Sequence, residues 1–598
     1  MTSVPTRQTA RARFGSKLLV AILVFLFAIS VVGFASAVID AGDTASPSPN
    51  AGPGAATGAS VDASADRFRL AVAEASVPPS PSVPSPSASP ASQSDAPQLR
   101  PIVPVVGFWS RTDGMPRRDI KAALETGKAK GFKRIVVEEG VAAGLASTLN
   151  IELHADVRVR DRSRVEAAVA KGGLGFLEVT DVSPRVKALR INGAALFGND
   201  RVDSLDAWPL MADAATAASE DDDGGTGDED QAPEASGAPE VVPLADAKDD
   251  PEAAPRTWDP ADTWVLVAGG DSFTDRGVYD NVVNKGRGVD FPFDGGTARV
   301  TGHGCCDPVF NDNVVPRYEL TGDKGIVRKL FRSAELAIAN HEAPVTEGWA
   351  FHRRGFRFSG KPELTRVFTR AGIDWVSLAN NHIKDYGTDG IADTRRILKK
   401  FGIAFSGAGK DLKQARKTRP LDINGTKVTI IPCVGVARAA WAGPKTSGGT
   451  PCLDQYIVKD IKKAARTSDV VIVFPHWGVE YTRQPLPSMR KHAARWVKAG
   501  ADLILGAHSH VAGAIEDIDG SPVLYSLGNL IFDQHWSTNT MESFMLEATF
   551  NGDRLVQLRL HPYIVHAQSQ PNLLDPRKGE GRRLLKSVRA ASRDELDW

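Results

Sequence analysis

The sequence predicts a multidomain α/β protein, and three observations support that fold class. The chain has 598 residues, more than the roughly 250 to 300 at which single domains usually stop growing. Short apolar runs with the length of buried strands alternate with amphipathic helical patterns in both halves of the chain. In the C-terminal half, five of these runs end in polar residues that are able to bind metals. Alternating strands and helices imply a mostly parallel sheet, with ligands gathered beyond its carboxyl edge.

The first 39 residues predict a membrane anchor. Residues 1–17 are basic, and residues 18–39 form an uncharged apolar run that is long enough to cross a hydrocarbon core of roughly 30 Å. The basic flank should stay in the cytoplasm, which gives a single-pass cell-membrane protein with extracytoplasmic C-terminal domains. A cleaved signal peptide is the alternative, since Ala35-Ser36-Ala37 has the small-x-small form that a signal peptidase accepts. Both interpretations export the rest of the chain.

Three further segments precede the C-terminal domain. Residues 40–100 are rich in Ala, Ser and Pro and predict a disordered stalk. Residues 101–211 alternate strand and helix patterns and predict a small α/β domain, which resembles half of a periplasmic substrate-binding protein or serves as a spacer. Residues 212–257 contain EDDDGGTGDEDQ and predict an acidic flexible linker, with loose calcium capture as the alternative.

Composition and cysteine usage exclude two classes of function. Lys plus Arg number 72 and Asp plus Glu number 72, so no overall basic charge attracts nucleic acid. The four cysteines form no CxxC pair, so a zinc knuckle is excluded. Cys433 and Cys452 flank a loop in an exported domain, where a disulfide is plausible, whereas the partners of the adjacent Cys305 and Cys306 are not predicted.

From Trp258 onward, polar side chains follow the predicted strands. The five runs are WVLVAGGD ending at Asp271, ELAIANHE at Glu342, WVSLANNH at Asn381 and His382, VVIVFPHWG at His476, and DLILGAHSH at His508 and His510. Helical patterns between them cover 361–371, 389–401, 456–466 and 487–499. Because the ends of parallel strands meet at one crevice, we expect these side chains to converge. Mixed nitrogen and oxygen donors suit zinc, manganese or iron, and the number of donors favours two divalent ions.

Six motifs in this half carry a family resemblance. GGDSFTDRG, IANHEAPVT, LANNHIKDYG, PHWGVEY, GAHSHV and YSLGNLIFDQ occur in the order found in the CapA family of poly-γ-glutamate capsule proteins. That family resembles the calcineurin-like metallophosphoesterases. The resemblance covers a domain over residues 258–570 and implies an α-β-β-α sandwich of two sheets, with 571–598 left as a polar tail that ends in a helix.

The resemblance also implies a role for each motif residue. Asp271 and His510 would bind one metal, Asn381, His476 and His508 the other, and Glu342 would bridge them. His382 would serve the leaving group, oriented by Asp385. Asn340, Arg276 and Asn529 would contact substrate. Two ions roughly 4 Å apart lower the pKa of a shared water and neutralise a phosphoryl group.

Two positions depart from the pattern of the wider superfamily. Phe273 stands where many members have a histidine ligand, so the first metal site should be weakened. His341 stands where family members commonly have leucine. It is a candidate substitute ligand, although its place on the strand predicts that it points away from Glu342.

Three functions are compatible with these residues. The first is synthesis or export of an anionic capsule polymer of the poly-γ-glutamate type, alongside synthetase subunits, with a hydrolase-like metal site. The second is a metallophosphoesterase that acts on an envelope phosphoester. The third is a polymer-binding module without catalysis. Four arginines on predicted loops, Arg276, Arg353, Arg354 and Arg357, could hold an anionic substrate or serve solubility.

Overall fold

The computed structural model describes residues 99–213, 258–304 and 314–592. They belong to one compact unit, 93–598. The predicted anchor, stalk and acidic linker, together with Cys305 and Cys306, lie outside the described residues. Within the described ranges, no helix is both long and apolar enough to span a bilayer.

Residues 99–213 form a small α/β layer, in which helices pack against one sheet. Their sheet has the order β4-β3-β5-β1-β6, with β8 also paired to β1. The strands are β1 (Leu99–Gly107), β3 (Ile135–Glu138), β4 (Arg158–Arg160), β5 (Leu174–Glu178), β6 (Val186–Ala188) and β8 (Met211–Asp213), with the short pair β2 (Gly114–Met115) and β7 (Arg190–Ile191) beside them. The helices are α2 (Arg117–Thr126), α3 (Glu139–Leu149) and α4 (Arg162–Ala170). The apolar strand residues and the inward helix residues form one hydrophobic core.

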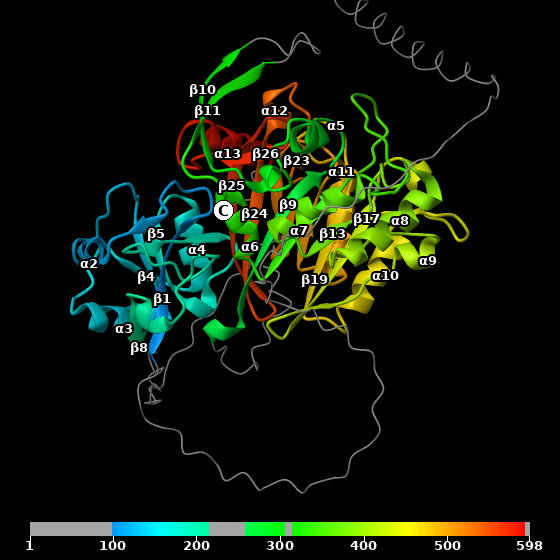
Figure 1. Cartoon of the computed structure of the whole chain (residues 1–598). Coiled ribbons are helices and arrows are strands. Elements are labelled where there is room, and N and C mark those ends of the chain that lie inside the picture. Colours follow the sequence, from blue (N-terminus) through cyan, green and yellow to red (C-terminus); the bar gives the residue numbers. More distant parts are fainter. Residues whose placement is uncertain (1–98, 214–257, 305–313, 593–598) are drawn as a thin grey trace, which may run out of the picture. The chain divides into compact units, whose positions relative to one another are not determined.

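Residues 258–304 and 314–592 contain two main sheets, one of ten strands and one of six (Figure 1). The ten-stranded sheet has the order β11-β10-β26-β25-β24-β9-β12-β13-β14, with β23 on β9. Its strands are β9 (Thr263–Ser272), β10 (Thr297–Gly304), β11 (Val315–Thr321), β12 (Leu336–His341), β13 (Trp375–Ser377), β14 (Ala404–Ser406), β23 (Asn529–Ile531), β24 (Glu542–Asn551), β25 (Arg554–His566) and β26 (Gln570–Leu573).

The six-stranded sheet has the order β16-β17-β19-β20-β22-β21. Its strands are β16 (Leu421–Ile423), β17 (Thr426–Val434), β19 (Val470–His476), β20 (Leu503–Leu505), β21 (Ile515–Ile518) and β22 (Ser521–Leu524). A further short pair joins β15 (Ala408–Gly409) and β18 (Gly448–Gly449). Strands β9, β12, β13 and β14 pair in parallel, as do β17, β19, β20 and β22. The parallel strands predicted from the sequence are therefore divided between two sheets.

Alternation along the strands explains how the two sheets pack. Trp264 and Leu266 of β9 share a core with Ile472 and Phe474 of β19, so this core lies between the sheets. The intervening residue Val265 packs outward against helices. Because successive strand residues point to opposite faces, each central strand is apolar on both faces. The result is the layer order helix, sheet, sheet, helix.

Helices cover both outer faces. The ten-stranded sheet is covered by α6 (Ile326–Arg332), α7 (Arg366–Ala371) and α8 (Gly387–Lys400). The six-stranded sheet is covered by α10 (Asp454–Ala464) and α11 (Pro487–Lys498). The short helices are α5 (Arg276–Tyr279), α9 (Leu412–Ala415) and α12 (Thr538–Met541). The helices predicted at 389–401, 456–466 and 487–499 occur within two residues of those bounds, whereas only the second half of 361–371 is α-helical.

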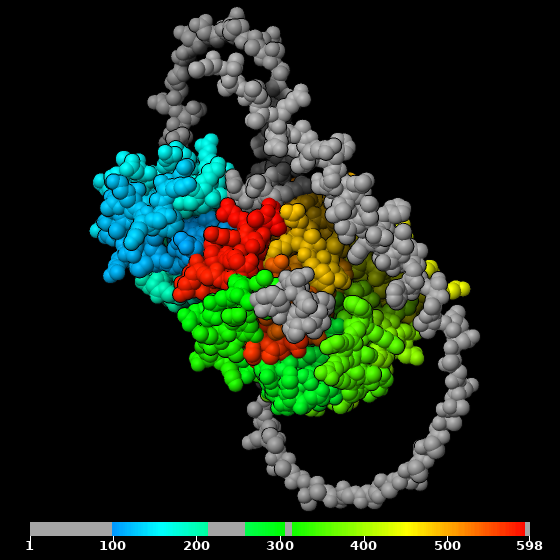
Figure 2. All heavy atoms as spheres, turned by 90° about the horizontal axis from the view of Figure 1, so that it is seen from above, coloured from blue at the N-terminus to red at the C-terminus, as the bar shows by residue number. Residues whose placement is uncertain are grey.

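The C-terminal segment differs from the predicted polar tail. Residues 570–573 form strand β26, and α13 (Gly579–Ala591) buries Leu584, Leu585 and Val588 in the core between the sheets. These three residues lie on one side of a helix, and the charged residues between them obscure that apolar stripe in the sequence. Figure 2 shows α13 beside residues of the first α/β layer, in agreement with the hydrogen bond from Arg582 Nη1 to the Trp109 carbonyl oxygen (3.0 Å).

Candidate metal centre

The predicted ligands lie where strands of both large sheets end. Asp271 is the penultimate residue of β9, and Glu342 directly follows β12, its parallel neighbour. His476 is the last residue of β19 in the other sheet. His508 and His510 follow β20, which pairs in parallel with β19. The centre therefore lies across the junction of the two sheets.

The acidic and histidine ligands form two overlapping groups. Glu342, His476 and His508 place their donor atoms within 4.8 Å of one another, and so do Asp271, Glu342 and His510. Asn381 adds its Oδ1 at 2.6 Å from His476 Nε2. Glu342 belongs to both groups, which is the position expected of a bridging carboxylate. The grouping is the one that the sequence motifs implied for two metals.

One donor atom at the centre of these groups has no hydrogen-bond partner in the protein. Glu342 Oε1 is buried and makes no hydrogen bond to the protein. It lies 3.6 Å from His476 Nε2 and 3.8 Å from His510 Nε2. His508 Nδ1 lies 3.1 Å from His476 Nε2, so two imidazole nitrogens also converge. A buried carboxylate oxygen without a hydrogen-bond partner destabilises the folded protein, and a divalent cation among these atoms would supply the missing interaction. The residues fit a metal pair.

Burial shifts the pKa values of these groups in the direction of their neutral forms. It raises the pKa of Asp271 to about 6. It raises the pKa of Glu342 further above its ordinary value, and the neighbouring Asp271 adds to this shift. Burial also lowers the pKa of His508 to about 4 and that of His510 to about 3. The imidazoles are thus neutral at pH 7, which is the form that binds metals.

Backbone geometry at the centre is unusual. His508 has a φ of 93° and His510 a φ of 58°, in the region that non-glycine residues rarely occupy. Such strain is concentrated at functional sites, where the surrounding structure maintains it.

A close approach of two backbone segments explains why residue 270 is a glycine. A Cβ on Gly270 would lie 1.9 Å from the Gly528 carbonyl oxygen. That oxygen accepts a hydrogen bond from the Asp271 N–H at 2.8 Å.

Two residues that were predicted to contact substrate also hold candidate ligands in place. Asn340 is buried, and its Nδ2 lies 2.8 Å from Asp271 Oδ1, 3.4 Å from Glu342 Oε2 and 3.3 Å from His476 Nδ1. Asn529 Oδ1 accepts from His510 Nδ1 at 2.9 Å. That bond leaves His510 Nε2 unprotonated and directed toward Glu342. Residues that orient ligands in this way are important for metal affinity.

Arg276, the third predicted substrate contact, is already paired. Its guanidinium forms an ion pair with Asp533 and donates to the Gly355 carbonyl oxygen at 2.8 Å. It also lies over the Phe358 ring, 4.6 Å from the ring centre. Arg276 is therefore a partnered and largely buried residue, whereas the sequence predicted an arginine on a loop.

His382 and Asp385 form a pair beside the ligand groups. His382 Nδ1 lies 2.9 Å from Asp385 Oδ2, and the His382 ring packs against Phe358 at 4.0 Å. Asp385 Oδ2 also accepts from the Phe358 N–H at 2.8 Å, which fixes the carboxylate. The His382 side chain keeps 14% of its surface exposed, so its other nitrogen is able to reach a bound molecule. This is the arrangement of a positioned general acid.

The two departures from the superfamily pattern have structural explanations. His341 is buried on the other face of β12, where its ring lies 5.0 Å from that of Phe368 and neither nitrogen has a hydrogen-bond partner. It is not among the converging ligands. Phe273 stacks on Phe532 at 4.2 Å, so an aromatic core occupies the place of the missing imidazole.

One buried network near the centre had no signal in the sequence. Asp275 Oδ2 lies 2.6 Å from His352 Nδ1 and accepts from the Ser359 N–H at 2.9 Å. His352 Nε2 in turn lies 3.3 Å from the Tyr386 hydroxyl. The network ties the loop of residues 350–360 to the segment that carries His382 and Asp385. Its members are separated by up to 111 residues in the chain, and no motif joins them.

Comparison with known proteins identifies relatives of this half of the chain. Residues 265–534 match the family described as "Bacterial capsule synthesis protein PGA_cap". The "PGA biosynthesis protein CapA" of Bacillus subtilis is 30% identical over 244 residues, 40% of this chain and 64% of that protein. The "Capsule biosynthesis protein CapA" of Bacillus anthracis is 30% identical over 230 residues, 37% and 56% of the two chains. The matched part therefore spans less than two thirds of these relatives.

Among solved structures, a 5'-nucleotidase precursor from Thermus thermophilus is similar at 14% identity and a TM-score of 0.29. The similarity covers 55% of this chain and 58% of the nucleotidase.

Proposed function

Since residues 265–534 carry the domain of the bacterial capsule synthesis proteins, we propose that this chain takes part in the synthesis or export of an anionic surface polymer of the poly-γ-glutamate type. The observation that carries the proposal is the match of this domain together with the convergence of six candidate ligands from five strand ends. The layer order of the domain supports its assignment to the calcineurin-like fold. The chain would act outside the cell, anchored by residues 18–39 and accompanied by synthetase subunits.

The centre would hold two divalent ions, of manganese, zinc or iron. Asp271 and His510 would bind one ion, Asn381, His476 and His508 the other, and Glu342 both. Bound ions of this kind supply Lewis-acid charge to a reacting ester or amide. Asn340 and Asn529 would hold the ligands in position through the hydrogen bonds described above.

Metal content tests this part directly. The full-length chain, purified gently in detergent, is expected to contain close to two ions per chain by elemental analysis. His508→Ala should lower that content, because His508 belongs to one of the two ligand groups. His492→Ala is the matched control, since His492 pairs with Asp454 at 2.7 Å outside the centre. Fewer than one ion in the unmodified chain would contradict the metal pair and favour a polymer-binding module.

The cellular role is tested by deletion of the gene in its host. Surface polyanion, measured after hydrolysis of washed cells, should fall and should be restored by the unmodified gene. Glu342→Ala should not restore it, whereas His492→Ala should. An unchanged amount of surface polymer in the deletion strain would refute the proposed role.

A phosphoesterase that acts on an envelope substrate is a second candidate, favoured by the His382–Asp385 pair at 2.9 Å. His382 would donate a proton to the leaving oxygen, and Asp385 would hold the Nδ1–H so that Nε2 faces the reaction. General acid catalysis of this type contributes about 10²- to 10⁴-fold. With manganese and an aryl phosphodiester, His382→Ala should therefore lose about that factor in kcat while it retains its metal. Asp385→Asn should lose less, and no turnover with any divalent metal would exclude this candidate.

A further inference from the structure

A large cavity lies away from the metal centre. Its volume is about 1490 Å³, and none of the proposed metal ligands, nor His382 or Asp385, lines it. One part of its wall comes from residues 108–116 and 187–200 of the first α/β layer. The opposite part comes from β10, α6, β25 and the segment 573–585, which includes the start of α13. Pockets for small ligands usually measure about 300 to 1,000 Å³, so this space is large enough for a longer molecule.

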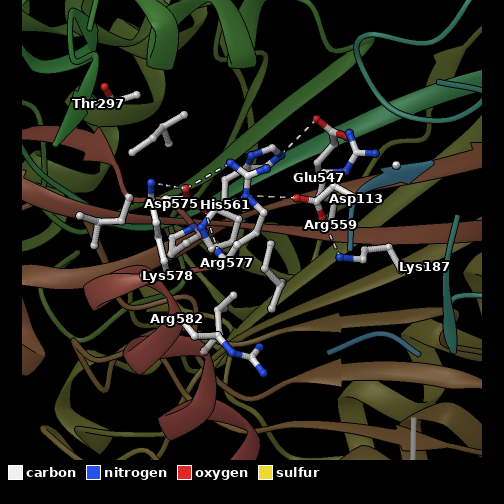
Figure 3. A pocket seen from close by; sticks show the side chains of 18 of the residues that line it. Asp113, Lys187, Thr297, Glu547, Arg559, His561, Asp575, Arg577, Lys578 and Arg582 are labelled. Atoms are coloured by element: carbon white, nitrogen blue, oxygen red, sulfur yellow. Dashed lines mark hydrogen bonds and ion pairs between the residues drawn. The ribbon is translucent and has the colours of Figure 1, made fainter. Parts of the chain in front are cut away.

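Cations outnumber anions along the wall. The basic residues are Lys187, Arg190, Arg299, Lys329, Arg559, Arg577, Lys578 and Arg582, and the acidic residues are Asp113, Asp200, Glu547, Asp575 and Glu580. Eight against five leaves three positive charges in excess. The cations come from different elements, and Figure 3 shows Lys578, Arg582 and Lys187 on separate sides of the pocket. Cations on several sides of a pocket suit a ligand with several anionic groups better than a single small anion.

Each carboxylate of the wall already has a cationic partner. Asp113 pairs with Lys187 at 2.8 Å, and Asp575 pairs with Arg577 at 3.0 Å. The other three pairs follow the same pattern: Asp200 with Arg190, Glu547 with Arg559, and Glu580 with Arg583. The wall's acidic residues therefore do not add a repulsive negative charge, and their remaining oxygens are able to accept N–H groups.

Two of the wall cations lack such a partner. Among the described residues, no carboxylate lies within ion-pair distance of Lys329 or Arg582. Arg582 donates to the Trp109 carbonyl oxygen at 3.0 Å, but its buried Nε has no hydrogen-bond partner. A guanidinium that lines the cavity and has no carboxylate partner keeps donor capacity for an anionic ligand.

Apolar side chains also line the cavity. Phe108, Leu558, Leu560 and Leu585 belong to its wall together with the charged groups. A suitable ligand therefore combines anionic groups with apolar links, and carries amide N–H groups that match the paired carboxylates. A phosphate chain lacks both the apolar links and the N–H donors.

We propose that this cavity binds a segment of a linear polyamide that carries carboxylates, and so forms a second polymer site besides the metal centre. Lys329 and Arg582 would bind successive carboxylates by charge-assisted hydrogen bonds. The choice of a γ-glutamyl polymer as the ligand depends on the proposed function, whereas the position of the site depends only on the cavity.

The test uses the full-length chain in detergent and a fluorescent γ-glutamyl oligomer, with binding followed by anisotropy. Lys329→Glu and Arg582→Gln should each raise Kd by about tenfold or more, since each removes a charge-assisted contact. Lys324→Glu and Arg589→Gln change exposed residues of the same two segments that do not line the cavity, and they should leave Kd within about twofold. Lys329 is exposed, so its variant should fold even if Arg582→Gln does not.

A metal-centre variant separates this site from the proposed function. His508→Ala should lose metal while it keeps the oligomer affinity of the unmodified chain. Loss of binding in His508→Ala with no effect of Lys329→Glu would place the polymer at the metal centre and overturn the proposal. Absence of binding by the unmodified chain, or equal displacement by tripolyphosphate, would also overturn it. If the chain contains no metal and shows no turnover, but its binding of the γ-glutamyl oligomer still depends on Lys329, only the proposed function is contradicted.

Discussion

At the scale of single residues, the centre brings two carboxyl groups together where water cannot solvate them. Asp271 and Glu342 are both completely buried, and the field of Asp271 raises the pKa of Glu342 beyond the effect of burial. In the absence of a cation, such a pair favours protonation of one member. A divalent ion would replace the proton, so the buried acids would be a stabilising feature only with the ion bound.

Asn340 provides a direct test of this arrangement. Its Nδ2 lies within 3.4 Å of atoms of Asp271, Glu342 and His476. Asn340→Ala should therefore leave the ligands present but less well oriented, and metal affinity should fall by about 10- to 100-fold. Competition with a metal-sensitive dye measures this change. Asn284→Ala, which removes a surface asparagine bonded to Asp280, is the control, and equal metal affinity in the two variants would contradict the role of Asn340.

The positions of the candidate ligands could be predicted from the sequence because each lies at the end of an apolar strand. Parallel strands end at the same edge of a sheet, so side chains at these ends lie close together. Asp271, Glu342 and His476 are of this kind. The role of Arg276 could not be predicted, because its partner Asp533 is 257 residues away and the ion pair exists only after folding. Asn340 belongs to the motif that carries Glu342, but the motif did not indicate that its side chain would also contact Asp271 and His476, which come from distant strands.

At the scale of elements, one covalent bond joins a central strand to a helix that covers it. Cys433 of β17 and Cys452, which precedes α10, form the disulfide that the sequence suggested. A crosslink over 19 residues restricts the unfolded chain and should contribute about 3 kcal/mol. The double variant Cys433→Ala/Cys452→Ala should lose about that much stability in urea unfolding. If reduction with dithiothreitol lowers the stability of the variant as much as that of the unmodified chain, the estimate is wrong.

The packing of α13 depends on a buried acid. Glu542 of β24 is completely buried and pairs with Arg583 of α13, yet burial and the nearby Glu580 raise its pKa from 4.5 to about 9. Between these two values only the folded protein retains the proton. The free energy of unfolding should therefore fall with rising pH across this interval, by up to about 1.4 kcal/mol per pH unit from this group.

Glu542→Gln removes that dependence, because the amide does not ionise. Relative to the unmodified chain, the variant should gain thermal stability as the pH is raised from 6 to 9. The Tm difference between the two proteins, measured at both pH values, gives the result. Glu319→Gln changes an exposed residue paired with Arg299 and should show a constant difference. A Glu542→Gln difference that is equally constant would show that Glu542 is ionised in the folded protein at pH 6.

Regular apolar patterns made the central strands and three of the helices predictable. The hairpin of β10 and β11 had no comparable signal, because its residues are largely exposed and the pattern of buried alternation is missing. The burial of α13 was not predicted either. Its few apolar residues become part of a core only when they pack against β-strands that lie far away in the sequence.

At the scale of the whole molecule, the two α/β parts share packing. Val556 of β25 lies in the core of residues 99–213, and Gln557 Oε1 accepts from the Ala188 N–H at 3.0 Å. Arg185 pairs with Asp517 at 3.2 Å across 332 residues. Contacts over such separations were not predictable, because no local pattern in a sequence indicates which residues hundreds of positions away will pack together. Residues of the same two parts, Ala188 and Leu558 among them, line the proposed polymer cavity.

The proposed anchor at the N-terminus is testable by fractionation. With its own N-terminus, the chain should remain in the membrane fraction after extraction with alkaline carbonate, because the apolar run 18–39 is long enough to span the bilayer. Externally added protease should degrade the C-terminal domains in intact protoplasts, since the basic residues before the run should stay inside. A chain that begins at residue 40 should appear in the soluble fraction of the producing cells. Release of the intact chain by carbonate would contradict the anchor, whereas a mature protein that begins at residue 38 would establish a cleaved signal peptide in its place.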